Sequence, residues 1–108
     1  MLTAFVGTNS LRGSQGIYTL AIDEHTADMK IVRTIPAENS SYLCIDKDEK
    51  HLYATIESNS FHGIDGGGVS AYQIDEDGNL TFINEQPTYG KLPCYVDVES
   101  DYLYVSNY

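Results

Sequence analysis

The sequence of 108 residues is long enough for one small domain and too short for two. Hydrophobic residues make up 42% of it and aromatic residues 11%, which suffices for a core and excludes wholesale disorder. Sixteen acidic residues oppose six basic ones, and the formal net charge of -10 excludes nucleic acid as a partner because the chain repels a phosphate backbone.

Neither a membrane segment nor a disulfide framework is expected. No apolar run approaches the roughly 20 residues that a membrane helix needs, and Met1 to Thr8 has neither the basic nor the apolar region of a signal peptide. We therefore expect a cytoplasmic protein with no membrane partner. Cys44 and Cys94 are too few for a disulfide framework and lack the paired spacing of a zinc site, so both are expected to be reduced, buried thiols.

Short runs of β-branched, aromatic and aliphatic residues recur along the whole chain, and this is the composition of β-strands. In chain order, the expected strands cover residues 4–8, 17–22, 29–34, 42–45, 52–56, 69–74, 80–83, 94–98 and 103–106. No window keeps apolar residues at the helical period for three turns. The sequence therefore predicts an all-β protein without a long helix.

An internal repeat distinguishes between a β-sandwich and a β-propeller, the two architectures that such strands allow. Residues 16–23 match residues 68–75 at a spacing of 52 positions. Further matches follow at a spacing of 51: Pro36 with Pro87, Asp46 with Asp97, and Leu52-Tyr53 with Leu103-Tyr104. A period near 50 with four strands in each unit is typical of β-propeller blades of four antiparallel strands.

Acidic clusters between the strands are expected to be turns. Asp75 to Asn79 places a glycine where a tight hairpin needs one, and both Asp46 to Lys50 and Asp97 to Asp101 are expected to form turns stabilised by the aspartate side chain. Neither Asp75 nor Asp46 begins a loop with the glycine and glutamate positions of an EF-hand. We therefore expect no metal site, and no motif indicates a cofactor.

Several motifs together resemble a known family. They are Phe5 to Thr8 followed by Gly16 to Tyr18, Leu52 to Glu57, Gly67 to Tyr72, Gly90 with Pro93-Cys94, and Ser106 to Tyr108. In order and spacing they resemble the seven-bladed lactonase β-propellers, which include bacterial 6-phosphogluconolactonases and share their fold with fungal muconate lactonizing enzymes. One position departs from the family pattern, because Tyr95 stands after Pro-Cys where the family usually has histidine.

The resemblance implies that the chain is an amino-terminal segment of a seven-bladed propeller, since seven blades of about 50 residues need roughly 350. Residues 1–35 would be a partial first blade, 42–86 a complete blade, and 94–108 the inner hairpin of the next, with the remainder of the domain missing. Such a segment leaves open sheet edges, through which self-association is expected.

The activity implied by the resemblance is hydrolysis of a small sugar lactone by a cytoplasmic, 6-phosphogluconolactonase-like enzyme of carbohydrate metabolism, in the pentose phosphate pathway. The main catalytic residues are then expected downstream of Tyr108, and this segment alone is expected to be inactive. Two alternatives stay open. One is a propeller that serves as a non-enzymatic binding platform, and the other is a muconate-type lactonizing enzyme that needs no phosphate contact.

Propeller topology predicts that four segments share one rim around the channel mouth: residues 7–16, 57–68, 88–93 and 107–108. Within them, Glu57 and His62 are candidate catalytic groups: Glu57 as a carboxylate that orients the substrate or serves as a base, and His62 as a general base. Arg12, Lys91 and Asn107 are candidate substrate-binding groups, as two phosphate contacts and one hydrogen-bond donor. Each also has a plain structural explanation as a solvated loop or strand-end residue. Neither a phosphate-binding glycine loop nor a serine-hydrolase motif is present.

Overall fold

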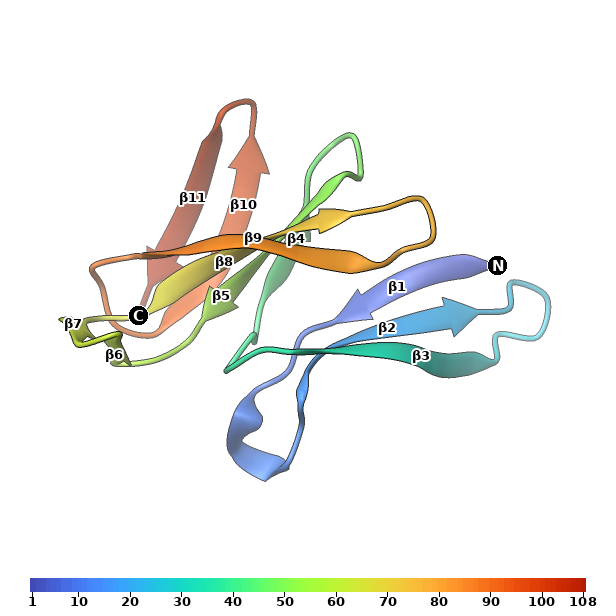
Figure 1. The fold of residues 1–108 in the computed structure, drawn as a ribbon, viewed down its shortest axis with the longest axis horizontal. Helices are drawn as coiled ribbons and strands as arrows, with labels where there is room; N and C mark the ends of the chain where they lie inside the picture. The colour runs from blue at the N-terminus through green and yellow to red at the C-terminus, as the bar shows by residue number, and fades with distance from the viewer.

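The computed structural model describes residues 1 to 108, and its regular elements are β-strands and one short 3-10 helix (Figure 1). The elements are β1 (Leu2–Val6), η1 (Ser10–Arg12), β2 (Gly16–Ile22), β3 (Met29–Pro36), β4 (Leu43–Ile45), β5 (His51–Ile56), β6 (Ser60–Phe61), β7 (Ile64–Asp65), β8 (Gly68–Ile74), β9 (Leu80–Pro87), β10 (Pro93–Glu99) and β11 (Tyr102–Asn107). Every strand expected from the sequence is present. No helix in the structure is long and apolar enough to cross a membrane.

The long strands form three antiparallel units that follow one another along the chain. The first sheet has the order β1-β2-β3, the second has the order β4-β5-β8-β9, and β10 and β11 pair as a hairpin. Strands β6 and β7 form a separate small hairpin within the connection from β5 to β8. Figure 1 shows the three units side by side, with β10 next to β4 and β5. The structure thus confirms the all-β fold of antiparallel units, one of which, β4-β5-β8-β9, has all four strands.

The internal repeat is confirmed by the strand registers. Gly16 pairs with Pro36 across β2 and β3, and Gly68 pairs with Pro87 across β8 and β9. Each pair of strands also has one irregularity, which follows Thr19 in β2 and Ala71 in β8. These are equivalent positions in the repeat, so the two units share a β-bulge as well as a sequence pattern.

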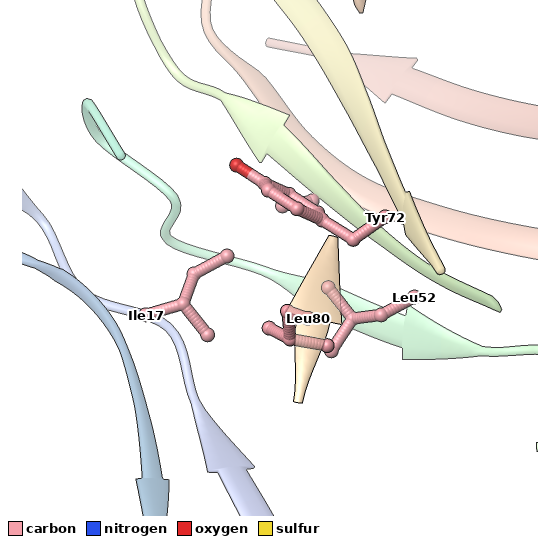
Figure 2. Packing of buried hydrophobic residues seen from close by; sticks show 5 residues of the cluster. Ile17, Leu52, Tyr72 and Leu80 are labelled. Carbon is pink, nitrogen blue, oxygen red and sulfur yellow. The ribbon is translucent and has the colours of Figure 1, made fainter. Parts of the chain in front are cut away.

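The core lies between the first and second sheets. It consists of five buried residues: Ile17, Leu52, Ala54, Tyr72 and Leu80. All of them except Ala54 are labelled in Figure 2. Full burial of a side chain the size of leucine or isoleucine stabilises the folded state by about 1.5–3 kcal/mol. Because Ile17 comes from β2 and the other four from the second sheet, this cluster fixes the packing of one sheet on the other.

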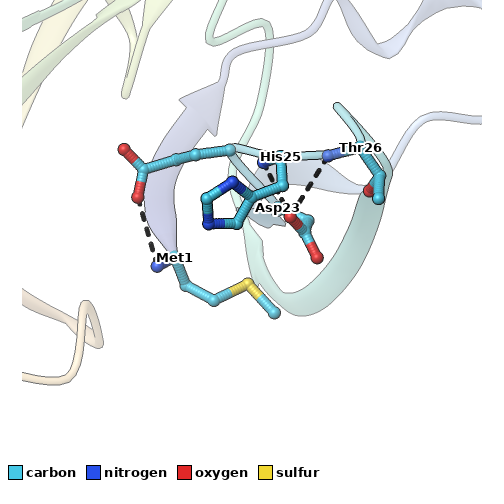
Figure 3. A network of polar contacts seen from close by, with 5 residues as sticks. Met1, Asp23, His25 and Thr26 are labelled. Carbon is cyan, nitrogen blue, oxygen red and sulfur yellow. Dashed lines mark hydrogen bonds and ion pairs between the residues drawn. The ribbon is translucent and has the colours of Figure 1, made fainter.

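Aspartate side chains stabilise the turns of equivalent hairpins in the two repeats. Asp23 Oδ1 accepts hydrogen bonds from the backbone N–H groups of His25 (2.8 Å) and Thr26 (3.3 Å), close to the contact between the amino terminus and Glu24 (Figure 3). Asp75, its repeat equivalent, accepts hydrogen bonds from the side chain and backbone of Asn79, which lower the pKa of its carboxyl group. Both are turn residues, as the sequence predicts.

Two expectations about individual residues are wrong. Cys94 is exposed rather than buried, although Cys44 is half-buried and both thiols are free. Asp97 does not form a turn like its repeat equivalent Asp46, since it lies within β10 opposite Tyr104. The hairpin reverses instead at Ser100, whose φ is 55°.

Candidate functional site

The connections that the sequence assigns to one rim meet at one end of the sheets. We refer to residues 7–16, 57–68, 88–93 and 107–108 as the loop rim. Figure 1 shows η1, the β6–β7 hairpin and the carboxyl terminus at this end, while the turns from β2 to β3, β8 to β9 and β10 to β11 lie at the opposite ends of their strands. Propellers place their ligand sites on such loops.

Backbone hydrogen bonds join three of the four rim segments directly. The N–H of Gly67 donates to the carbonyl oxygen of Gly90 at 2.8 Å, and the N–H of Leu92 donates to that of Ser58 at 3.1 Å. The N–H of Tyr108 in turn donates to the carbonyl oxygen of Lys91 at 3.0 Å. Residues 57–68, 88–93 and 107–108 therefore form one connected structure.

The first rim segment is joined to the others through Asn39. The Oδ1 atom of Asn39 accepts a hydrogen bond from the N–H of Ser10 at 3.0 Å, and its own N–H donates to Ser10 Oγ at 2.9 Å. Its carbonyl oxygen accepts from the N–H of Glu57 at 3.1 Å. Asn39 adopts a φ of 47°, a left-handed conformation that asparagine tolerates better than most residues. The sequence reasoning missed this residue, because it lies outside the four predicted segments.

Two of the candidate substrate-binding residues lie close together. Lys91 is exposed, with Nζ 3.6 Å from Asp65 Oδ1. Asn107 immediately precedes Tyr108, whose N–H donates to the carbonyl oxygen of Lys91. The side chain of Asn107 packs against Gly90 so closely that a Cβ atom there would lie 2.5 Å from Asn107 Cγ. A cation and an amide are thus held on one rigid part of the rim.

Arg12 occupies a different part of the rim. It ends η1, whose first turn is capped by Asn9, since Asn9 Oδ1 accepts from the N–H of Leu11 at 3.1 Å. Gly13 follows in the left-handed conformation with a φ of 83° and ends the helix. Arg12 is exposed and makes no hydrogen bond or ion pair, so its guanidinium group is available for a ligand.

The two candidate catalytic residues, Glu57 and His62, have different neighbours. Glu57 is half-buried directly after β5, and its backbone is fixed by Asn39. His62 and Gly63 form the two-residue turn between β6 and β7, with φ values of 49° and 81°, which is the geometry of a tight hairpin turn. From there the His62 ring bonds to Glu85 of β9. His62 therefore faces the outer strand of the second sheet.

The β10–β11 hairpin and the neighbouring residues around β4 contribute polar and aromatic groups that the sequence reasoning largely missed. The ring of Tyr95 lies 5.0 Å from that of Tyr42, and its hydroxyl donates to Asp97 Oδ2 at 3.4 Å. The charge of Asp97 raises the pKa of Tyr95. Burial, with Asp97 and Asp46 nearby, raises the pKa of the Cys44 thiol to about 11. These groups are protonated at neutral pH, and Tyr95 serves there as a hydrogen-bond donor.

The rim thus carries two exposed side chains with positive charge, Arg12 and Lys91, and the amide of Asn107. No group of three or more histidine, cysteine, aspartate or glutamate side chains is arranged to hold a metal ion.

Comparisons with known proteins agree with this architecture. The family described as "Lactonase, 7-bladed beta-propeller" matches residues 3–108. The 6-phosphogluconolactonase of Bacillus subtilis strain 168 is 37% identical over 109 residues, covering 96% of this chain and 30% of that protein. The 6-phosphogluconolactonase of Formosa agariphila is 29% identical over 110 residues and is also covered to 30%.

Solved structures share the fold at similar coverage. The crystal structure of a candidate 6-phosphogluconolactonase from Bacteroides fragilis NCTC 9343 has a TM-score of 0.89 and 32% identity, covering 99% of this chain and 29% of that one. The periplasmic gluconolactonase of Pseudomonas aeruginosa has a TM-score of 0.87 and 29% identity, covering 98% and 31%.

Repeated antiparallel sheets with their long connecting loops at one end make this a β-propeller protein. Within that class, the chain belongs to the lactonase family of seven-bladed β-propellers. It spans about 30% of the length of the curated relatives it matches.

Proposed function

We propose that this chain contributes part of the substrate-binding rim to a sugar-lactone hydrolase, with 6-phosphogluconolactone as the substrate. The observation that carries the proposal is the family match over residues 3–108, combined with a rim that presents Arg12, Lys91 and Asn107. The relatives from Bacillus subtilis and Formosa agariphila bear the name of this activity. The pentose phosphate pathway follows as the metabolic setting.

In this proposal the three units are successive blades. Residues 1–35 supply the second, third and outer strands of one blade, residues 42–86 a complete blade, and residues 94–108 the inner hairpin of a third. The strand orders β1-β2-β3 and β4-β5-β8-β9 support this assignment, because their β-bulges occupy equivalent positions.

The rim groups then have distinct roles. Lys91 and Arg12 hold the substrate phosphate, while Asn107 donates a hydrogen bond to a lactone or hydroxyl oxygen. Glu57, fixed by Asn39, orients the sugar. His62 is the weaker candidate for a general base, because its ring is engaged by Glu85. The main catalytic groups belong to parts of the propeller outside these 108 residues.

The proposed compartment is the cytoplasm. Its support is the pair of free thiols, one of them exposed, because reducing compartments preserve free cysteine. The Pseudomonas aeruginosa neighbour is named as periplasmic, so the family is compatible with more than one compartment. Fractionation of the source cells with an antibody against this chain tests the assignment.

The activity is tested with a chimera, since the chain corresponds to about 30% of the Bacillus subtilis relative. In the chimera these 108 residues replace the matching segment of that enzyme. We expect it to hydrolyse 6-phosphogluconolactone above the spontaneous rate, whereas the isolated chain does not. The Lys91→Ala chimera should have a raised KM for this substrate, and a Lys47→Ala chimera, altered at the opposite end of the sheets, should not.

Two other results would contradict the proposal. A chimera that melts cooperatively but shows no activity on any lactone favours a non-enzymatic binding platform. Activity on muconolactone that is indifferent to both Lys91→Ala and Arg12→Ala favours a muconate-type enzyme, since that substrate carries no phosphate.

A further inference from the structure

A pocket lies between the first and second sheets, apart from the cations of the loop rim. Its volume is about 550 Å³, within the range of roughly 300–1,000 Å³ that small-molecule sites occupy. The end of β3 and the residues after it form one wall, while β8, β9 and the β6–β7 hairpin form the other. Both walls belong to this chain, and the shared core fixes one sheet on the other.

Aromatic rings form the apolar side of this intersheet pocket. Tyr72 and Phe82 meet edge to face with ring centroids 5.8 Å apart, and Phe61 packs edge to face on His62 at 4.5 Å. Tyr72, labelled in Figure 2, and Phe61 are buried, whereas Phe82 is 54% exposed. Phe82 is therefore a large apolar side chain that borders the pocket while remaining accessible to a ligand.

Carboxylates form the polar side. Glu85 lines the pocket from β9 and is bonded to His62 Nε2, which holds its side chain in place. Glu38 lines the pocket from the segment after β3 and is exposed. None of the lysine or arginine side chains lines the pocket. Even when His62 is protonated and balances Glu85, the charge of Glu38 leaves the pocket negative.

The repeat does not account for these side chains. At the equivalent positions of the first sheet, Tyr72 corresponds to Leu20, Phe82 to Ile31, and Glu85 to Thr34. The shared fold keeps its glycines, prolines and β-bulge without any of the three. Phe82 and Glu85 are thus particular to this pocket, whereas Tyr72 also packs in the core between the two sheets.

We infer that the intersheet pocket binds an organic ammonium ion with an aromatic or aliphatic body. The ammonium group would lie between Glu85 and Glu38, and the body would pack on Tyr72 and Phe82, where the ring faces also attract a cation. The pocket should not bind a phosphorylated sugar, because both carboxylates repel its phosphate. This site is therefore separate in chemistry from the rim that holds Arg12 and Lys91.

The experiment uses benzylammonium as the probe and benzyl alcohol as its neutral counterpart. Both are titrated into the 108-residue chain, with binding followed by calorimetry and by chemical-shift changes of the aromatic rings. We expect saturable binding of benzylammonium that shifts the resonances of Tyr72 and Phe82, and weaker binding of benzyl alcohol. Loss of one charged hydrogen bond costs about 1.5 kcal/mol or more, so Glu85→Gln should weaken benzylammonium about tenfold.

A matched control removes the same charge elsewhere. Glu99→Gln changes the net charge by the same amount but lies in β10, outside the pocket, and should leave the affinity unchanged. If Glu85→Gln fails to fold, the affinity of Glu38→Gln for benzylammonium tests the inference instead, because Glu38 is exposed and makes no hydrogen bond. This variant should also bind the probe more weakly than the wild type. Equal weakening by Glu99→Gln, equal affinity for benzyl alcohol, or displacement of the probe by glucose 6-phosphate would overturn the inference.

Discussion

Gly90 and Asn107 are in such close contact that a larger residue at position 90 would have to displace the Asn107 side chain. A Cβ atom built on Gly90 would lie 2.5 Å from Asn107 Cγ and 2.8 Å from its Cβ. The φ of Gly90 is outside the left-handed region, so an alanine would be excluded by the neighbour and not by the backbone. The glycine thus sets how near the loop of residues 88–93 approaches the end of β11.

This relationship predicts the effect of Gly90→Ala. The added methyl group must displace Asn107, and overpacking of this kind costs about 1–3 kcal/mol. Urea unfolding should show that loss of stability. In the Asn107→Gly background, where the obstructing atoms are absent, the same change at position 90 should cost much less. Equal costs in the two backgrounds would contradict the steric explanation.

A second prediction concerns Thr19, which is 1% exposed and whose hydroxyl group has no hydrogen-bond partner. Thr19→Val keeps the shape and removes the unsatisfied group, so it should stabilise the chain by about 1 kcal/mol. Thr55 is the matched control, since it is equally buried but its Oγ1 accepts from the N–H of Tyr42 at 3.1 Å. Thr55→Val should therefore lower the melting temperature while Thr19→Val raises it.

The strands and the repeat were predictable because they depend on local composition and on matches between segments. The bulge after Thr19 and Ala71 is common to both units, whereas the spacing changes from 52 to 51 because the following turn is one residue shorter in the second unit, at residues 75–79 compared with 23–28. One extra residue is accommodated in the partner strand of each unit, so the pattern survives in the sequence.

The candidate site was less predictable, because side-chain directions depend on contacts that sequence spacing does not encode. His62 lies in a predicted rim segment, but a two-residue turn directs its ring to Glu85, which is 23 positions away. Asn39 joins two rim segments and gave no signal, since one asparagine before serine is common in loops. Asp97 matched Asp46 in spacing, yet the tighter hairpin at Ser100 leaves it within the strand.

That difference between the two aspartates leads to a prediction. Asp46 Oδ1 accepts hydrogen bonds from the N–H groups of Lys50 (2.8 Å) and His51 (3.1 Å), and its Oδ2 lies 2.7 Å from His51 Nδ1. Asp97 accepts from one backbone N–H, that of Val98. Asp46→Ala should therefore destabilise the chain by about 1–3 kcal/mol at pH 7, and Asp97→Ala by less.

The effect of Asp46 should also depend on pH. Burial acts to raise the pKa of its carboxyl group, but the hydrogen bonds from His51 and Lys50 outweigh burial and lower the pKa below its ordinary value of 3.8. A lowered pKa in the folded state means that the stabilisation is complete above pH 3.8 and is lost as the pH falls through the folded value. The stability difference between wild type and Asp46→Ala should shrink below that pH, and a constant difference would exclude the ionic contribution.

The two thiols should react at different rates. Cys94 is exposed, whereas the thiol of Cys44 is half-buried and has its pKa raised to about 11, so little thiolate is present at pH 8. Iodoacetamide should modify Cys94 first, as seen by mass spectrometry of the Cys44→Ser and Cys94→Ser variants. In urea both variants should react alike, and a persistent difference there would show that the fold is not its cause.

The open edge of β11 should cause the isolated chain to self-associate. This strand pairs only with β10, and its exposed tyrosines Tyr102 and Tyr104 are 68% and 56% accessible. An unpaired edge with large apolar side chains is a template for another strand, and a lysine there opposes such pairing. Sedimentation velocity should show a mass that rises with concentration for the wild type and less so for Tyr104→Lys. Tyr89→Lys makes the same replacement at a loop residue that is 77% exposed and lies outside the strands, so it should associate like the wild type.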